Sequence, residues 1–408
     1  MKEFLKINRW DLNLILTIIG FPFFTTLISD STASIVYRGF ALLVALMCLC
    51  KTGVQIVRSG TVRSFLFVLL YVSIQALFGL FFGEYADFPY SEVKFLFLLF
   101  NIGILWVPLL AFIGGFDRIQ WKKVVPLVFL LMLFTVVHAD FGTIGAEVST
   151  SGRYDMGRLS TLAFGDNGGY LVMMSAALLA TRKSWLTRMN TLVVLMLIIA
   201  IIAGLFAVMK AGSRGPLVGC VTGLLFLVYC MRGKDRTILM TSIVVLFISG
   251  AVSMSKIEEF APALYSRITM TVEDKDMSGR DLLFEDAYAK FQDNILLGSN
   301  PIILERTQFT TCHNVYLETL QGGGIFIFLF FIYALLCVVF GSVKIRGLLL
   351  QHSGYLFLFM LFFCNMGRGL SGIMLTSNAI YAFPFTGCCI ILYYIKKGYL
   401  IIQKNNNN

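Results

Sequence analysis

The chain has 408 residues, of which 58% are hydrophobic and only 14% charged, and its formal net charge at pH 7 is +10. At a mean hydropathy of +0.81 it carries more apolar surface than a soluble fold of this length can bury, which excludes a soluble globular protein. Lipid is therefore the predicted solvent of most of the chain.

Twelve apolar runs approach the roughly 20 residues that a membrane-spanning helix needs. Because lipid offers the backbone no hydrogen-bond partners, we expect these runs to be helices and the protein to be all-α and integral to the membrane. The first run ends in Ser-Asp-Ser-Thr rather than at a small-residue cleavage site, so it is interpreted as a span and not as a signal peptide. In chain order the runs lie at about 11–29, 34–50, 65–83, 95–115, 124–138, 168–181, 190–209, 216–231, 237–254, 324–341, 348–364 and 377–395.

Lysine and arginine predict the orientation of these spans. One set of connecting segments carries 20 basic and 4 acidic residues, whereas the opposite set carries 13 basic and 19 acidic residues. The positive-inside rule then places both termini in the cytoplasm. The net charge of +10 is thus a topology signal, and nucleic acid is not an expected partner. The basic set comprises the N-terminus, 51–64, 116–123, 182–189, 232–236, 342–347 and the C-terminus.

Long loops on the outer side set the predicted organisation. Loops 83–94, 139–167 and 255–323 exceed what a connection requires, and long ordered loops are usually functional. The largest is expected to be a partly helical periplasmic catalytic loop. The four predicted parts are nine transmembrane helices in 1–254, this loop in 255–323, three transmembrane helices in 324–398 and a polar cytoplasmic tail in 399–408.

The nine cysteines predict neither a disulfide framework nor a zinc site. Eight of them lie in or at the ends of apolar runs, where they behave as small hydrophobes. Cys312 alone lies in a polar loop, and metal-ligand spacings are absent around it.

Glycine-flanked arginines occur at two places on the outer side. Arg153 and Arg158 lie in SGRYDMGRLSTLAFGDNGG of the middle loop, and Arg368 lies in CNMGRGLSG between the last two spans. Each can approach an anion, or can anchor the protein in the lipid headgroup region.

The segment AVMKAGSRGPLVG joins the seventh and eighth spans. Pro216 suits the first turn of a helix, so Arg214 is predicted to stand just before that helix, with Lys210 one turn back on the preceding one. Two cations near membrane depth with no carboxylate between them indicate an anionic ligand at headgroup level. The alternative is snorkelling of both side chains to lipid phosphates.

The segment SGRDLLFEDAYAKFQDNILLGSNP begins with a capping-box pattern, Ser278 followed by Asp281. A helix is predicted from there, with Leu283, Ala287 and Phe291 forming its apolar stripe and Gly298 and Pro301 stopping it. Arg280 then lies in the first helical turn, where free N–H groups and a guanidinium favour phosphate. Pairing of Arg280 with Asp276 or Asp281 on a solvated face is the alternative.

The segment TCHNVYLETLQGGG holds one of only three histidines. Thr310 or Thr311 is the predicted cap of a short helix that ends at Leu320, and Gly322–Gly324 is predicted to break the chain before the tenth span. His313 in the first turn would remain neutral and able to accept a proton. With Tyr316 and Glu318 on nearby turns to orient it, His313 could serve as a general base, or it could simply lie at the membrane interface.

The order of these motifs resembles the bacterial O-antigen polymerase and O-antigen ligase superfamily. The resemblance covers roughly 207–395 and consists of SRG ahead of a span, GRxxLFxxAxxxFxxNxLLG, HNxYLExLxxGG and three terminal spans; the first 150 residues are similar only in topology. One departure is Asn294-Ile295, where many relatives have Asn-Pro in a turn. The motifs stand at Ser213–Gly215, Gly279–Gly298 and His313–Gly324.

The resemblance implies a multispanning inverting glycosyltransferase of the GT-C type, active at the periplasmic face of the bacterial inner membrane without a metal or other cofactor. Its donor would be an oligosaccharide on undecaprenyl pyrophosphate. His313 would be the catalytic base, and Arg214 and Arg280 would contact the pyrophosphate. Membrane lipids and a chain-length regulator protein are the further partners considered. The remaining predicted substrate-binding residues are Lys210, Arg153, Arg158, Asn314, Glu318 and Arg368.

The favoured function is an O-antigen polymerase that joins lipid-linked repeat units. One alternative is an O-antigen ligase, which would transfer the glycan to the lipid A core. A second alternative is a lipid-linked glycan transporter, but such proteins usually carry ionisable residues near mid-bilayer, and the predicted spans carry their charges at the ends.

Overall fold

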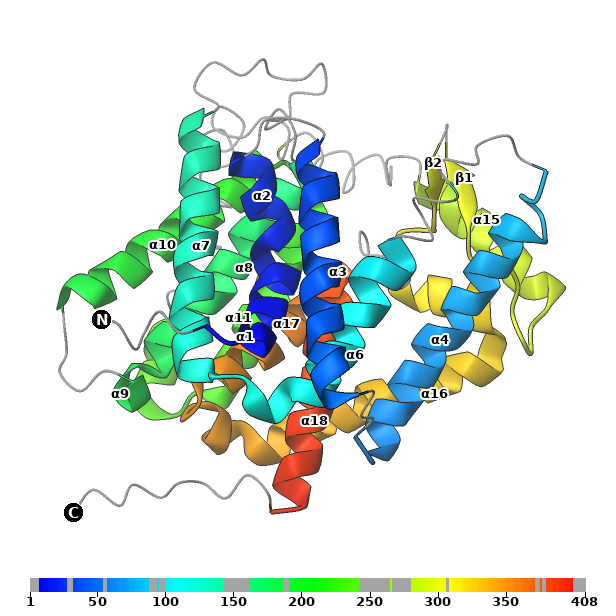
Figure 1. Ribbon diagram of the computed structural model, residues 1–408. Helices are drawn as coiled ribbons and strands as arrows, with labels where there is room; N and C mark the ends of the chain where they lie inside the picture. The colour runs from blue at the N-terminus through cyan, green and yellow to red at the C-terminus, as the bar shows by residue number, and fades with distance from the viewer. Residues whose placement is uncertain are drawn as a thin grey trace.

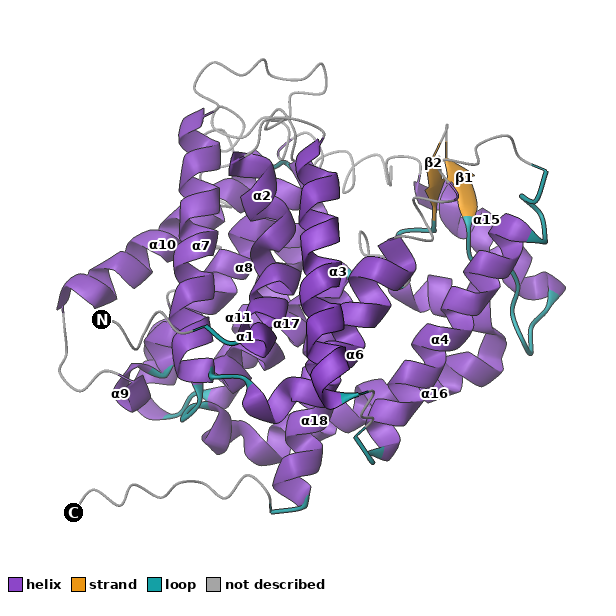
Figure 2. Ribbon diagram, in the orientation of Figure 1, coloured by secondary structure: helices purple, strands orange, loops and turns teal. Residues whose placement is uncertain are grey.

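The computed structural model of the chain describes residues 7–27, 32–53, 57–87, 94, 100–142, 161–185, 191–241, 265, 280–305, 308–370, 375 and 379–398. Most of these residues lie in helices, and the strands found in the described part occupy one corner of the molecule (Figure 1, Figure 2). The predicted helical architecture is confirmed.

The first half of the chain forms a series of apolar helices. The first span is one continuous helix that contains a π-helical stretch, η1. A second π-helical stretch, η2, leads into α6. The elements are α1 (Arg9–Ile15), η1 (Leu16–Gly20), α2 (Phe21–Leu27), α3 (Thr32–Thr52), α4 (Gly60–Phe81), η2 (Phe100–Trp106), α6 (Val107–Gly115), η3 (Phe116–Arg118) and α7 (Trp121–Gly142).

The second half continues the bundle and adds the hairpin. The longest described helix, α16, has 35 residues. The elements are α8 (Thr161–Ala180), α9 (Arg182–Trp185), α10 (Thr191–Lys210), α11 (Arg214–Cys230), α15 (Arg280–Asp293), β1 (Ile303–Glu305), β2 (Gln308–Thr310), α16 (Val315–Leu349), α17 (Ser353–Arg368) and α18 (Ala379–Lys396).

The described helices fit a membrane protein. Six are long and apolar enough to cross a bilayer by length and composition: Arg9–Leu27, Gly60–Phe81, Trp121–His138, Thr191–Lys210, Val315–Leu349 and Ala379–Lys396. Large apolar side chains such as Leu192 and Ile202 on α10 are exposed, as expected of a surface that faces lipid. The total of twelve spans stays a prediction, and most of the ninth predicted span, 237–254, lies outside the described residues.

The prediction of an all-α fold missed a short antiparallel sheet. Strands β1 and β2 pair Ile303 with Thr310 and Glu305 with Gln308. Each strand has only three residues, which is too short for an alternating pattern to stand out in the sequence. The hairpin lies in the large loop, directly before the segment that holds His313.

The triple glycine breaks α16 as predicted, and the structure shows why glycine is needed there. Gly324 has φ 61° and ψ −173°, a backbone conformation that is essentially restricted to glycine. The N–H groups of Ile325 and Phe326, which the break leaves without helical partners, donate to the carbonyls of Ile295 (2.8 Å) and Leu296 (3.3 Å). The turn after α15 therefore docks onto the break in α16.

Candidate active site

His313 has an unusual backbone conformation. Its φ is 55°, and among the described residues it is the one residue other than glycine with a positive φ. The left-handed region is sparsely populated for non-glycine residues, and such conformations cluster at functional sites. The His313 side chain is partly exposed.

The predicted cap of the following helix was wrong. Asn314, and not Thr310 or Thr311, is the N-cap of α16, because its Oδ1 accepts from the backbone N–H groups of Tyr316 (3.0 Å) and Leu317 (3.1 Å). Thr310 lies in strand β2 instead. His313 therefore precedes the helix rather than lying in its first turn.

Glu318 is fully buried and holds two segments together. Its Oε2 accepts from the Thr311 hydroxyl at 3.3 Å and from the backbone N–H of Leu375 at 2.7 Å. Thr311 lies two residues before His313, and Leu375 belongs to the connection between α17 and α18. The carboxylate thus fixes the His313 segment relative to the last helical pair.

The start of α16 docks on the end of α17. Asn314 Nδ2 donates to Leu370 O (3.2 Å), Val315 N to Gly369 O (2.9 Å) and the Tyr316 hydroxyl to Met366 O (3.1 Å). All three acceptors are backbone carbonyls in the last turn of α17 or just after it. The segment of His313 is therefore held by backbone and side-chain contacts on both sides.

Arg368, at the end of α17, is nearly inaccessible. Its side chain is 3% exposed and forms an ion pair of 2.5 Å with Asp166 of α8. Nearby, the Tyr170 hydroxyl donates to Asn365 Oδ1 at 3.2 Å. Asp166 was missed in the sequence, where the only available signal was a lone carboxylate beside an apolar run.

Arg214 is the first residue of α11, with Ser213 in the N-cap position and Pro216 in the third helical position. Its side chain is partly exposed. Lys210 ends α10, with its Nζ 5.8 Å from the centroid of the Phe206 ring. The two cations therefore flank a tight turn between consecutive helices, although Arg214 begins α11 rather than standing just before it as the sequence had predicted.

Close backbone contacts place the start of α11 beside α8 and α17. A Cβ on Gly165 of α8 would lie 2.9 Å from Ala211 Cβ and 3.0 Å from Pro216 Cγ, and a Cβ on Gly219 would lie 3.4 Å from Arg368 Cβ. The start of α16, which directly follows the His313 segment, also contacts α17. Arg214 and His313 therefore lie at the same end of the bundle.

Helix α15 begins at Arg280, whose side chain lies outside the part that the structure describes. Further along α15, Ala287 and Leu283 form a small apolar cluster with Cys312, which attaches this helix to the His313 segment. Cys312 is buried, and its thiol donates to Asn314 O at 3.4 Å. Burial, with the Glu318 carboxylate nearby, raises the pKa of Cys312 to about 12. Arg153 and Arg158 lie outside the described residues.

Residues 198–332 match the model of a protein family described as O-antigen ligase. The match covers about a third of the chain. This match supports the resemblance to the O-antigen polymerase and ligase superfamily, and it indicates a glycosyltransferase-type enzyme in a membrane. No curated protein matches the chain.

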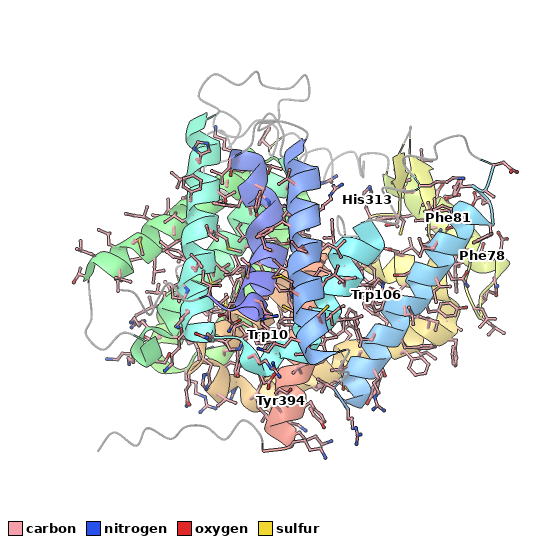
Figure 3. The ribbon with its side chains drawn as sticks, viewed as in Figure 1. Trp10, Phe78, Phe81, Trp106, His313 and Tyr394 are labelled. Atoms are coloured by element: carbon pink, nitrogen blue, oxygen red, sulfur yellow. The ribbon has the colours of Figure 1, made fainter. Side chains whose placement is uncertain are left out.

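The matched region contains six of the nine predicted site residues: Lys210, Arg214, Arg280, His313, Asn314 and Glu318. Arg368 lies outside the matched region but contacts it through α17. Figure 3 shows His313 near the hairpin, at the end of the molecule opposite Trp10 and Tyr394. Most of the predicted site residues therefore fall within the matched region.

Proposed function

We propose that the protein is an O-antigen polymerase that joins oligosaccharide repeat units carried on undecaprenyl pyrophosphate at the periplasmic face of the bacterial inner membrane. The observation that carries this proposal is the His313 segment. A partly exposed histidine is held in a left-handed conformation by Asn314, Glu318 and the end of α17, within a region that matches the O-antigen ligase family.

In the proposed reaction His313 removes the proton from a hydroxyl of the acceptor sugar. The hydroxyl oxygen attacks the anomeric carbon of the donor glycan, and the bond from that carbon to the pyrophosphate oxygen breaks with inversion. The electron pair stays on undecaprenyl pyrophosphate, whose negative charge Arg214 and Arg280 stabilise. Arg153, Arg158 and Lys210 are proposed to bind the substrate.

Three residues first expected to bind substrate are better placed to position other groups. Glu318 and Arg368 are buried, and Asn314 uses its side chain to cap α16 and to bind Leu370 O. We therefore assign them the task of holding the His313 segment and the surrounding helix ends. This revision leaves His313, Arg214 and Arg280 as the catalytic residues of the proposal.

The test is to replace His313 with alanine and to examine the lipopolysaccharide on a gel. Long glycan chains should disappear while the protein level stays normal, because the proposed proton acceptor is lost. His138→Ala removes an exposed histidine near the end of α7 and serves as a matched control that should retain long chains. Normal chain-length banding in the His313→Ala variant would refute the role of His313.

The description of the matched family favours a second candidate, an O-antigen ligase that uses the same donor and the lipid A core as acceptor. A deletion strain separates the two. A strain without a polymerase keeps a single repeat unit on the core, whereas a strain without a ligase keeps none.

A further inference from the structure

A basic groove opens at the end of the molecule opposite His313. It has a volume of about 880 Å³ and is lined by residues at the start of α4, in the second half of α16 and at the end of α18. Figure 1 shows where these three helices lie. This volume falls within the range of roughly 300–1,000 Å³ that is typical of ligand sites. Four cations line the groove: Arg58, Lys344, Lys396 and Lys397.

Within the described residues, the cations of this groove have no acidic counter-charge. No aspartate or glutamate is among the described residues that line it, and none of its four cations forms an ion pair within the described part of the chain. In a neighbouring hollow, by contrast, the Arg346 guanidinium lies 5.3 Å from the centroid of the Tyr229 ring, so it already has a π partner. Cations gathered without counter-charges attract an anionic ligand.

The walls of the groove are apolar. Tyr333, Leu336 and Phe340 of α16 line it and are 50%, 42% and 62% exposed, and Leu392 of α18 closes it by packing on Gly341. A ligand that fills the groove must therefore combine an anionic group with hydrocarbon. A free phosphate or a polar nucleotide would make no favourable contact with the apolar walls.

The cations come from three segments that the sequence assigns to the cytoplasmic side: 51–64, 342–347 and the C-terminus. The cytoplasmic leaflet carries the anionic lipids that attract such clusters, and basic pockets between transmembrane helices bind anionic headgroups. The Ser59-capped start of α4 also directs its positive dipole end toward the groove.

We propose that this groove is a binding site for an anionic phospholipid of the cytoplasmic leaflet. The phosphate lies among Arg58, Lys344 and the two lysines at the end of α18, and an acyl chain lies along Phe340 and Leu336. The site is separate from the proposed catalytic end and does not depend on the proposed reaction.

The test measures lipid binding to delipidated full-length protein by native mass spectrometry. Phosphatidylglycerol should bind saturably, and phosphatidylcholine and inorganic phosphate should not displace it. Each cation near an anionic headgroup changes binding by about fivefold, so the double variant Arg58→Gln/Lys344→Gln should bind phosphatidylglycerol about 25-fold more weakly. The exposed pair Lys234→Gln/Arg236→Gln is the matched control and should bind as the unmodified protein does.

A charge-preserving double variant distinguishes the loss of charge from misfolding. Arg58→Lys/Lys344→Arg should keep most of the binding, and the melting temperature in phosphatidylcholine should be the same for all variants. Equal binding of both lipids, displacement by inorganic phosphate alone, or an equal loss in the control pair would each overturn the proposal.

Discussion

At the end of the molecule that holds His313, the buried charges have partners, whereas the cations of the basic groove at the opposite end have none within the described residues. Arg368 is paired with Asp166, and Glu318 accepts two hydrogen bonds. Burial of an unpaired charge is expensive, so paired charges fix geometry. Exposed cations without counter-charges keep their full attraction for a ligand. Charge thus has different roles at the two ends. At the His313 end it holds helices together, and at the basic groove it is proposed to bind an anionic phospholipid.

The largest effect is expected when one partner of the buried ion pair between Arg368 and Asp166 is removed. Arg368→Ala leaves the Asp166 carboxylate without its cation in a buried position and should lower the free energy of unfolding by about 3–5 kcal/mol. Denaturant titration of the purified protein measures this loss. The double variant Asp166→Leu/Arg368→Met should recover most of the stability, and equal losses in the single and double variants would contradict the pairing argument.

Glu318→Gln tests whether a charged acceptor is needed at the same end. The amide offers a single neutral oxygen to the Thr311 hydroxyl and the Leu375 N–H, so we expect a loss of about 1.5–3 kcal/mol in the free energy of unfolding. Glu285→Gln, on the exposed face of α15, is the control and should change stability by less than about 0.5 kcal/mol. A loss no larger than that of the control would mean that Glu318 does not clamp the segment.

Gly324→Ala tests the link between the two ends, because α16 starts beside His313 and lines the basic groove further along. The added Cβ would lie 2.4 Å from Leu296 O, and the positive φ would be strained, at a cost of about 1–3 kcal/mol. Gly347→Ala in the same helix meets no atom within 4 Å and should be neutral or slightly stabilising. Thermal unfolding of both variants makes the comparison, and equal midpoints would argue against a required break.

The smallest expected effect concerns Cys312, whose thiol should not react with a labelling reagent. Burial raises the pKa of its thiol to about 12, so almost no thiolate is present at pH 8 and maleimide should not label it in the folded protein. Cys50 is exposed and should be labelled under the same conditions. Mass spectrometry of the labelled peptides provides the measurement, and rapid labelling of Cys312 would show that the cluster around it opens.

Much of the helical framework was predictable because a membrane-spanning helix requires a long apolar run, which is easy to recognise in a sequence. The break at Gly322–Gly324 was also predictable from composition, but its docking partner in the turn after α15 was not. Which carbonyls satisfy Ile325 and Phe326 depends on tertiary contacts.

The candidate site was less predictable than the helices. The segment of His313 could be singled out by its polar residues ahead of an apolar run. The N-cap of the following helix could not be predicted, because Thr310 and Asn314 are both residue types that cap helices. Only the pairing of Thr310 in β2 decides between them. The pair of Asp166 with Arg368 joins distant segments, which local patterns do not reveal.

The left-handed backbone at His313 implies a trade-off between durability and activity. A glycine would adopt φ 55° without the steric cost of about 1–2 kcal/mol that an L side chain incurs there. A chain selected for robustness alone would thus place glycine at this position. The stability that an imidazole costs at this position fits the proposed role of His313 as the catalytic base.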